Sequence, residues 1–400
     1  MTQEHPAAAG PNRWLILAGY ALLTACTQLL WLSYAPVTTE THRVMAVSEG
    51  AVGDLAVVFP LVYVVLALPA GRWLDARFGR ALSAGAVLTG AGALLRLAAP
   101  DSFGWALAGQ VVIAAGQPLV LNAITKIAAR HFPARERTVA VSVGSAALFA
   151  GILAAVLAGK PLFGAGGLRL LLLIEAIPAV VAAAWVLVTA RAPAAYPGDP
   201  SVAVSLGWLR RDRFVWLLGG LLFAGIGVFN AVATWLESIL QHFRLGSASG
   251  YLIALMTVAG ILGAAVLPEA AAARDRRRAL LITAVLVTAG AFALIAAWPR
   301  LAVVAVALFA AGFFLLAGLP VVLDWSELHT GPERSGAAAG FLLLAGNLGG
   351  VILVLIVQAL IGSPYLSLAA LAVAALAGAL LAVRLPARAA PGQVRPERSP

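Results

Sequence analysis

Residues 71–80 read Gly-Arg-Trp-Leu-Asp-Ala-Arg-Phe-Gly-Arg. This stretch is a short basic segment that lies between two long apolar runs, 52–74 and 81–99. Each run approaches the roughly 20 apolar residues that a helix needs to cross a bilayer. The glycines let two helices turn tightly and approach each other closely. The stretch therefore predicts the turn of a transmembrane hairpin, in which Asp75 can pair with Arg77 or with an arginine from another helix end.

The remainder of the chain is just as apolar. Hydrophobic residues make up 62% of the 400 residues and charged residues only 11%, whereas soluble domains have about 45–50% and about 25%. This composition excludes a water-soluble enzyme, a disordered chain and a disulfide scaffold. The one cysteine, Cys26, has no internal partner, and no Cys/His group has the spacing of zinc ligands. We expect neither a metal nor a cofactor.

Apolar runs cut by charge clusters and Pro/Gly turns predict an all-α integral membrane protein with twelve transmembrane helices. The N-terminal residues lack the basic stretch and cleavage site of a signal peptide, so the first run is expected to remain in the protein. The twelve runs lie near 14–37, 52–74, 81–99, 104–128, 138–159, 168–190, 214–241, 249–271, 279–298, 301–324, 336–361 and 365–387.

The basic residues predict the orientation. With twelve crossings and a cytoplasmic N-terminus, 21 of the 27 Lys and Arg residues fall on the cytoplasmic side. The other six are Arg43, Arg96, Lys160, Arg169, Arg244 and Arg300. By the positive-inside rule this bias places both termini in the cytoplasm of a multi-pass protein of the cell's inner (plasma) membrane. The net charge of +10 thus reflects topology, and no nucleic-acid partner is expected.

An internal repeat of about 200 residues indicates two related halves. Residues 115–122 (AGQPLVLN) resemble 317–324 (AGLPVVLD), and residues 136–140 (ERTVA) resemble 333–337 (ERSGA). The Leu-Pro pair at 68–69 and the basic turn after it match another such pair and turn about 199 residues later. We expect two pseudo-symmetric six-helix bundles. Their bounds are 1–190 and 213–400, with a central cytoplasmic loop at 191–212.

The turn at 71–80 resembles the signature between the second and third helices of the major facilitator superfamily. The Glu-Arg turns at 136–137 and 333–334 lie where that superfamily has similar turns. The resemblance implies alternating access, in which the two halves rock around a central site. The residues expected to act in gating are Asp54, Gly71, Asp75, Arg77, Gly79, Arg80, Arg137, Asp324, Glu327 and Arg334.

A narrower resemblance is to the feline leukaemia virus subgroup C receptor family, which is associated with choline, ethanolamine and haem transport. It is carried by residues 31–34 (WLSY), Asp54, Gly109-Gln110 with Gln117-Pro118, and the stretch from Glu327 to Gly340. The resemblance implies that Trp31 matches an aromatic residue of the choline site. Three positions depart from the family pattern: Asn230 stands in place of a second aromatic residue, and Ala146 and Asn347 in place of glutamines.

Polar residues inside the spans are candidates for substrate contacts, because a charged group at the bilayer centre is costly. Gln28, Trp31 and Tyr34 are spaced by three and are expected to share a helix face, where Trp31 offers a π surface to a cation. Asn230 and Glu237 lie two turns apart on another span. The expected substrate-binding residues are Gln28, Trp31, Tyr34, Gln117, Asn122, Asn230, Glu237 and Asn347.

Glu175 lies deep in the sixth span with no basic residue near it in sequence. A carboxyl group at such a position is a candidate for proton coupling, or alternatively a structural group of a peripheral helix. Glu237 is likewise either a substrate contact or an outer-end partner of Arg244.

The leading interpretation is a secondary transporter of a small organic solute, working in the lipid bilayer as a monomer, with protons as a candidate coupling ion. The sequence has no Gly-x-x-x-x-Gly-Lys phosphate loop, so ATP is not expected to drive it. A cationic or amphipathic metabolite, choline-like or haem-like, is one substrate class. The alternatives are a proton-coupled exporter of hydrophobic compounds and a receptor or scaffold on a carrier fold. No cluster of acid–base or metal-ligand residues indicates an enzyme.

Overall fold

The computed structural model describes residues 12–196, 207–360 and 362–387, without the side chains of residues 39, 49, 50, 237 and 247. In this part of the chain the secondary structure is helical throughout. The helices are α1 (Arg13–Trp31), α2 (Thr38–Met45), α3 (Glu49–Ala98), α4 (Phe103–Leu121), α5 (Ile124–His131), α6 (Ala134–Thr189), α7 (Arg213–Gln241), α8 (Ser249–Ala273), α9 (Arg277–Ala297), α10 (Leu301–Leu315), α11 (Gly318–Thr330), α12 (Ser335–Leu360) and α13 (Pro364–Ala382). Short 3-10 turns η1 (Ala35–Val37), η2 (Gly207–Arg210) and η3 (Gly246–Ala248) join some of them.

The helix α3 is a hairpin of two membrane-crossing arms. Its backbone leaves the helical conformation at Arg77, with φ −145° and ψ 61°. Leu55 of the first arm and Arg96 of the second both hydrogen-bond to Gln110 of α4, at 3.3 and 3.4 Å. Because residues 41 positions apart meet one side chain, the two arms run antiparallel, and the turn falls within the basic stretch 71–80.

The helix α6 is built in the same way. Its backbone departs from helical geometry at Gly166 and Gly167, and Gly167 has φ +68°, a conformation that favours glycine. A Cβ added at Gly144 of the first arm would touch Tyr20, and one at Gly19 would touch the Trp185 ring of the second arm. Both arms therefore pack along α1 in opposite directions.

These two hairpins explain the number of crossings. Within the described residues, ten helices are long and apolar enough to span a membrane, and two of them, α3 and α6, each contain two arms. The pairs α4–α5 and α10–α11 each make one crossing, broken near its end. The predicted twelve-helix membrane fold is confirmed.

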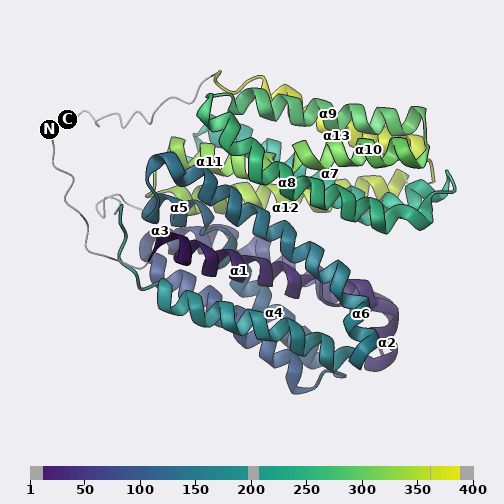
Figure 1. Ribbon diagram of the computed structural model, residues 1–400, viewed down its shortest axis with the longest axis horizontal. Coiled ribbons are helices and arrows are strands. Elements are labelled where there is room, and N and C mark those ends of the chain that lie inside the picture. The colour runs from purple at the N-terminus through teal and green to yellow at the C-terminus, as the bar shows by residue number, and fades with distance from the viewer. Residues whose placement is uncertain (1–11, 197–206, 361, 388–400) are drawn as a thin grey trace.

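The helices form two halves, α1–α6 and α7–α13, drawn in purple to teal and in green to yellow in Figure 1. The halves touch through α3 against α12 and α6 against α8. The start of α1 and the end of α13 lie at one end of the molecule, called here the terminal end, and the helices of the two halves diverge toward the opposite end (Figure 1).

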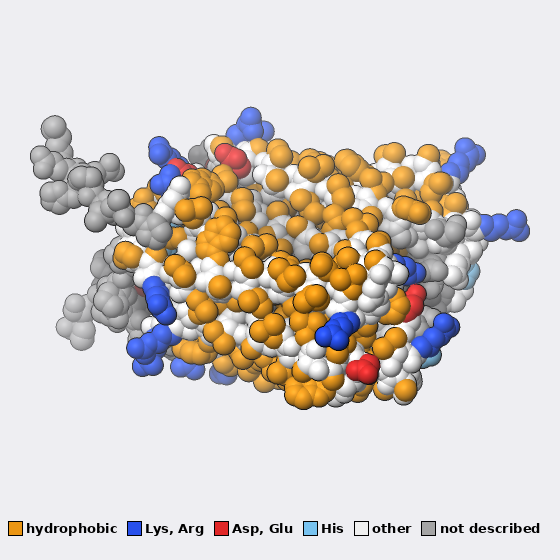
Figure 2. Space-filling model, turned by 60° about the horizontal axis from the view of Figure 1, so that its bottom comes forward, with side chains coloured by type: hydrophobic (Ala, Val, Ile, Leu, Met, Phe, Trp, Pro, Cys, Tyr) orange, Lys and Arg blue, Asp and Glu red, His pale blue; other side chains and the backbone are white. Residues whose placement is uncertain are grey.

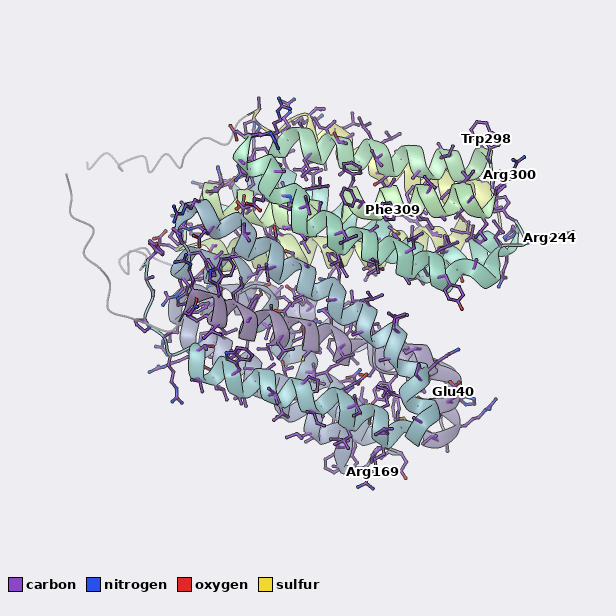
Figure 3. The ribbon with its side chains drawn as sticks, viewed as in Figure 1. Glu40, Arg169, Arg244, Trp298, Arg300 and Phe309 are labelled. Atoms are coloured by element: carbon purple, nitrogen blue, oxygen red, sulfur yellow. The ribbon has the colours of Figure 1, made fainter. Side chains whose placement is uncertain are left out.

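The outer surface is a bilayer-facing one. On the face shown in Figure 2, apolar side chains cover the middle, and most Lys and Arg side chains gather toward the two ends. Val65 and Val188 are 69% and 73% exposed, which suits a lipid solvent. Figure 3 shows Arg169, Arg244 and Arg300 at the end opposite the termini. Arg96, which the sequence analysis counted with them, is instead fully buried inside the first half.

Candidate functional site

A cavity lies between the two halves, with an empty volume of about 1050 Å³, part of which is open to solvent. Its walls come from both halves. The lining is mostly Leu, Ile, Val and Phe, and no charged side chain is among the residues that line it in the described part of the chain. An apolar pocket with a few polar groups is the usual form of a small-molecule site.

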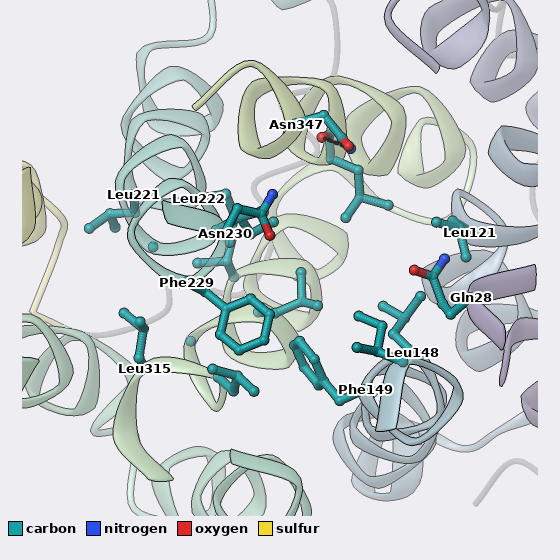
Figure 4. Close-up of a pocket in the computed structure, with 18 of the residues that line it drawn as sticks. Gln28, Leu121, Leu148, Phe149, Leu221, Leu222, Phe229, Asn230, Leu315 and Asn347 are labelled. Carbon is teal, nitrogen blue, oxygen red and sulfur yellow. Dashed lines mark hydrogen bonds between the residues drawn. The ribbon is translucent and has the colours of Figure 1, made fainter. Parts of the chain in front are cut away.

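Four amide side chains supply the polar groups of this cavity. Gln28 and Gln117 come from α1 and α4, and Asn230 and Asn347 come from α7 and α12. Gln28 and Asn230 point toward the open centre from opposite sides (Figure 4). Each half thus presents two side chains that can both donate and accept hydrogen bonds.

Aromatic rings supply the other distinctive surface of the cavity. Trp31 lines it, with its indole N–H donated to the carbonyl oxygen of Ala56 at 2.9 Å and its ring 6.2 Å from that of Phe59. Phe149 of α6 and Phe229 of α7 meet edge to face, with ring centroids 5.9 Å apart (Figure 4). This pair joins the two halves across the cavity wall, and the sequence analysis missed it because the two residues are far apart in sequence.

Five of the expected substrate-binding residues line the cavity, namely Gln28, Trp31, Gln117, Asn230 and Asn347. Tyr34 does not, and the expectation that it shares a face with Trp31 is wrong. The helix α1 ends at Trp31, so helical spacing no longer applies three residues later, and Tyr34 is buried in a separate cluster with Val37 and Leu55.

A further expected binding residue, Asn122, lies outside the cavity lining. Asn122 is fully buried, where it accepts a hydrogen bond from the Tyr63 hydroxyl at 2.6 Å and donates one to the carbonyl oxygen of Ala67 at 2.9 Å. Asn122 is therefore placed to brace α4 against α3. The backbone of Glu237 belongs to α7, but its side chain lies outside the described residues.

At the terminal end, Asp75 joins the two halves. One carboxylate oxygen accepts the N–H of Gly336 and the other that of Ala337, both at 2.9 Å. These amides belong to the first turn of α12, where backbone N–H groups lack helical partners and the dipole favours an anion. The cation beside Asp75 is Lys126 at 2.6 Å rather than the arginine that the sequence suggested. Lys126 also donates to the carbonyl oxygen of Glu333 across the interface at 3.3 Å.

A second set of acidic residues joins the halves from the other side. Asp324 of α11 accepts the Thr138 hydroxyl of α6 at 2.8 Å and pairs with Arg277 of its own half at 2.8 Å. Glu327, one turn later, pairs with Arg137 of α6 at 3.0 Å. The terminal end is thus closed by two polar contacts of different construction.

The two glycines of the turn allow close helix approach. A Cβ added at Gly71 would lie 2.6 Å from the carbonyl oxygen of Gly336, and one at Gly79 would lie 2.8 Å from that of Ala190. Neither distance is compatible with a side chain unless the backbone moves. Gly71 therefore sets how closely α3 and α12 meet.

The remaining gate candidates are less connected in this state of the molecule. Arg77 and Arg80 are exposed at the turn, and Asp54 is exposed at the start of α3, toward the opposite end. No ion pair joins these three to another described residue. The guanidinium of Arg334 lies 5.5 Å from the Trp208 ring centroid, a cation–π contact.

Glu175 lies inside the first half, away from the cavity lining. Its carboxylate lies 3.6 Å from the guanidinium of Arg96 and accepts a hydrogen bond from the Ser33 hydroxyl. No basic residue is near Glu175 in sequence, and Arg96 becomes its neighbour only through the packing of the helices. Within the described residues, no group of three or more His, Cys, Asp or Glu side chains is arranged to hold a metal ion.

The chain is similar in sequence to known membrane transporters. Solute carrier family 49 member A3 of Danio rerio is 31% identical over 378 residues, which covers 87% of this chain and 78% of that protein. The human choline/ethanolamine transporter FLVCR2 is 24% identical over 386 residues, covering 85% of this chain and 70% of that protein.

Solved structures share the fold. The human organic anion transporter MFSD10 (TETRAN) superposes with a TM-score of 0.76 at 14% identity, over 93% of this chain and 100% of that one. The transporter FucP, in its outward conformation, gives 0.72 at 15%, over 92% and 99%. The family profile of the Major Facilitator Superfamily matches residues 16–274. The chain therefore belongs to the Major Facilitator Superfamily of membrane transporters, and within it is related to the FLVCR transporters.

Proposed function

We propose that this membrane transporter carries a small organic cation of the choline type by alternating access. The observation that carries the proposal is the cavity itself, in which aromatic rings and four amides face an otherwise apolar space. Aromatic faces attract quaternary ammonium groups through the ring quadrupole. Amide groups from both halves can bind a hydroxyl or amine at the other end of such a molecule.

The absence of charged side chains from the described cavity lining supports this substrate class. A carrier of organic anions would be expected to place Lys or Arg against the substrate. Phe229 lies next to Asn230 on α7 and presents its ring to the cavity with Phe149. An aromatic surface from the second half therefore remains, although Asn230 holds the position at which the family pattern has an aromatic residue.

The distribution of Lys and Arg supports one orientation in the membrane. If the terminal end is cytoplasmic, as the excess of Lys and Arg there indicates, the contacts of Asp75, Asp324 and Glu327 close the cytoplasmic side. The structure then corresponds to an outward-facing carrier in the plasma membrane, with both termini inside. Breaking these contacts would begin the inward-facing half of the cycle.

A thermal-shift panel on the purified protein in detergent tests the substrate class, with choline, ethanolamine, haem, pyridoxine and lipophilic cations. A ligand at 100 times its dissociation constant stabilises the native state by about 2.7 kcal/mol if it binds only that state. We expect choline or ethanolamine to raise the midpoint and Trp31→Ala to remove the shift. Trp298→Ala is the matched control, since Trp298 is 59% exposed and lies at the end opposite the termini (Figure 3). No shift with either amine contradicts the proposal.

The apolar cavity lining favours a second candidate, a proton-coupled exporter of hydrophobic compounds. In that case only the lipophilic cations shift the midpoint. Glu175 is its candidate coupling group, and Glu175→Gln would then abolish the dependence of transport on a pH gradient. A variant that still responds to the gradient would exclude that role.

A further inference from the structure

The helix α1 ends next to the cavity, at Trp31, six residues before the end of the candidate membrane span Arg13–Val37. It runs for 19 residues from Arg13 to Trp31, which is about 28 Å. Leu32 then leaves helical geometry, with φ −98° and ψ 12°. The last carbonyl groups of a helix lack internal partners, and irregular backbone at membrane depth persists only where other protein groups satisfy it. Something must therefore bind the end of α1.

Arg96 and Gln110 provide these partners. The guanidinium of Arg96 donates to the carbonyl oxygen of Leu30 at 3.3 Å and to the Ser33 hydroxyl at 2.9 Å. The amide of Gln110 donates to the carbonyl oxygen of Trp31 at 3.5 Å and in turn accepts from Arg96 at 3.4 Å. A cation at a helix C-terminus also interacts favourably with the helix dipole.

Glu175 makes this arrangement sustainable. Arg96 and Glu175 have side chains that are 0% and 3% exposed, so neither charge is solvated. A buried arginine without a partner would be strongly destabilising, and the carboxylate 3.6 Å away balances it. The Tyr34 ring covers the guanidinium from 5.7 Å.

Gln110 also binds the segment of α3 that accepts the hydrogen bond of the Trp31 side chain. Gln110 donates to the carbonyl oxygen of Leu55 at 3.3 Å, and the Trp31 indole N–H is bound by the next carbonyl, that of Ala56. The backbone of Trp31 and the segment of helix α3 that binds its ring nitrogen are thus both held by the Gln110 amide.

We propose that Arg96, Gln110 and Glu175 are positioning residues, which fix the end of α1 so that the Trp31 ring faces the cavity. None of the three lines the cavity, so they act on a substrate only through Trp31. The consequence for affinity rests on the proposed function, but the placement of the ring does not. Glu175 then serves as a structural counter-ion, and not as the proton-coupling group.

The test uses the full-length protein labelled with 5-fluorotryptophan, with the Trp31 resonance assigned by its loss in Trp31→Phe. The main variant is the double substitution Arg96→Met with Glu175→Leu. Removing both charges together avoids an unpaired buried charge, and such replacements commonly preserve folding. Gln110→Leu is the second variant. The control is Arg43→Met with Asp101→Leu, which removes a similar pair of charges from exposed positions of the same half.

We expect the Trp31 fluorine signal to shift or broaden in both test variants and to stay unchanged in the control. With choline as the probe, KM should rise about tenfold, equivalent to about 1.4 kcal/mol, with little change in kcat or in the response to a pH gradient. An unchanged Trp31 signal in folded variants overturns the proposal. If the Arg96→Met, Glu175→Leu variant loses its response to a pH gradient while the Trp31 fluorine signal is unchanged, the proposal is overturned, and Glu175 acts in proton coupling instead. If wild-type protein binds no choline, the proposed function fails while the fluorine result still decides the positioning role.

Discussion

The two acidic contacts that close the terminal end differ in what binds the carboxylate. Asp75, from the first half, is bound by two backbone amides of α12 and by Lys126. Asp324 and Glu327, from the second half, are bound by side chains, with Thr138 and Arg137 coming from the opposite half. One contact therefore uses groups that exist at any helix start, and the other depends on particular side chains.

The two halves of the repeat share the same fold, but the residues that connect the halves differ between them. Asn122 and Asp324 occupy matching positions of the repeat, yet Asn122 binds Tyr63 and Ala67 of its own half, whereas Asp324 reaches Thr138 across the interface. The same position of the repeat therefore braces its own half in the first bundle and connects the halves in the second. The two contacts should respond differently to substitution.

The largest effect is expected at Gly71, on which the closeness of α3 and α12 depends. In Gly71→Val the new side chain collides with the backbone of Gly336, so the terminal end cannot close and transport should be lost. Electron–electron distance measurements between spin labels at the exposed turns, Arg80 and Arg274, should show a longer separation. Gly53→Val on the same helix is the control, because a Cβ there meets nothing within 4 Å. A distance between the two labels in Gly71→Val that equals the wild-type distance would contradict the role of Gly71 in closing the terminal end.

Asp75→Asn is expected to have the next largest effect. The amide loses the ion pair with Lys126 and can no longer accept at both oxygens, so turnover should fall at least about tenfold, a change of about 1.4 kcal/mol. Ligand-induced stabilisation should persist, because the cavity is untouched. Lys126→Met keeps both backbone contacts of Asp75 and should reduce turnover less. Equal losses in the two variants would contradict the distinction between backbone and side-chain partners.

The two charges of the ion pair between Arg137 and Glu327 should be interchangeable. Arg137→Gln or Glu327→Gln leaves one buried partner without its opposite charge and should reduce turnover severalfold. The reversed pair, Arg137→Glu with Glu327→Arg, should recover part of the loss in the same flux assay. No comparable reversal exists for Asp75, since backbone amides cannot be exchanged. A reversed pair as inactive as the single variants would show that the ion pair is not what matters there.

The smallest effect is expected at Asp212, whose contacts lie within the second half. Partial burial alone would raise the pKa of its carboxyl group, but hydrogen bonds from His329 and from the backbone of Val215 and Phe214 outweigh this and lower it. Its stabilising contribution is therefore complete above the unfolded pKa of about 3.9 and is lost as the pH falls through the lower folded value.

We expect Asp212→Asn to lower the midpoint of thermal unfolding at pH 7 by an amount equivalent to about 0.5 kcal/mol, given solvent screening. The difference from wild type should shrink below about pH 4. The label distance at the terminal end should not change, because this contact does not connect the halves. A changed distance would show that closure depends on more than the inter-half contacts.

The sequence predicted the helices well, because apolar length and charge clusters record membrane crossings directly. It also indicated the turn around Asp75, where glycines and charges are adjacent in the chain. It could not predict that Lys126 would be the partner of Asp75, or that Arg96 and Glu175 would meet, since those pairs form only when distant helices pack. Tyr34 was misplaced because α1 ends at Trp31, shortly before Pro36, and Arg96 and Gln110 of distant helices bind the last carbonyl groups.

The flux of labelled choline into proteoliposomes containing the purified protein tests the central claim most directly. We predict saturable uptake that excess unlabelled choline inhibits. Trp31→Ala should raise the KM of this uptake, and Asp75→Asn should lower its kcat. Vesicles with folded wild-type protein that take up no more choline than empty vesicles would contradict the central claim.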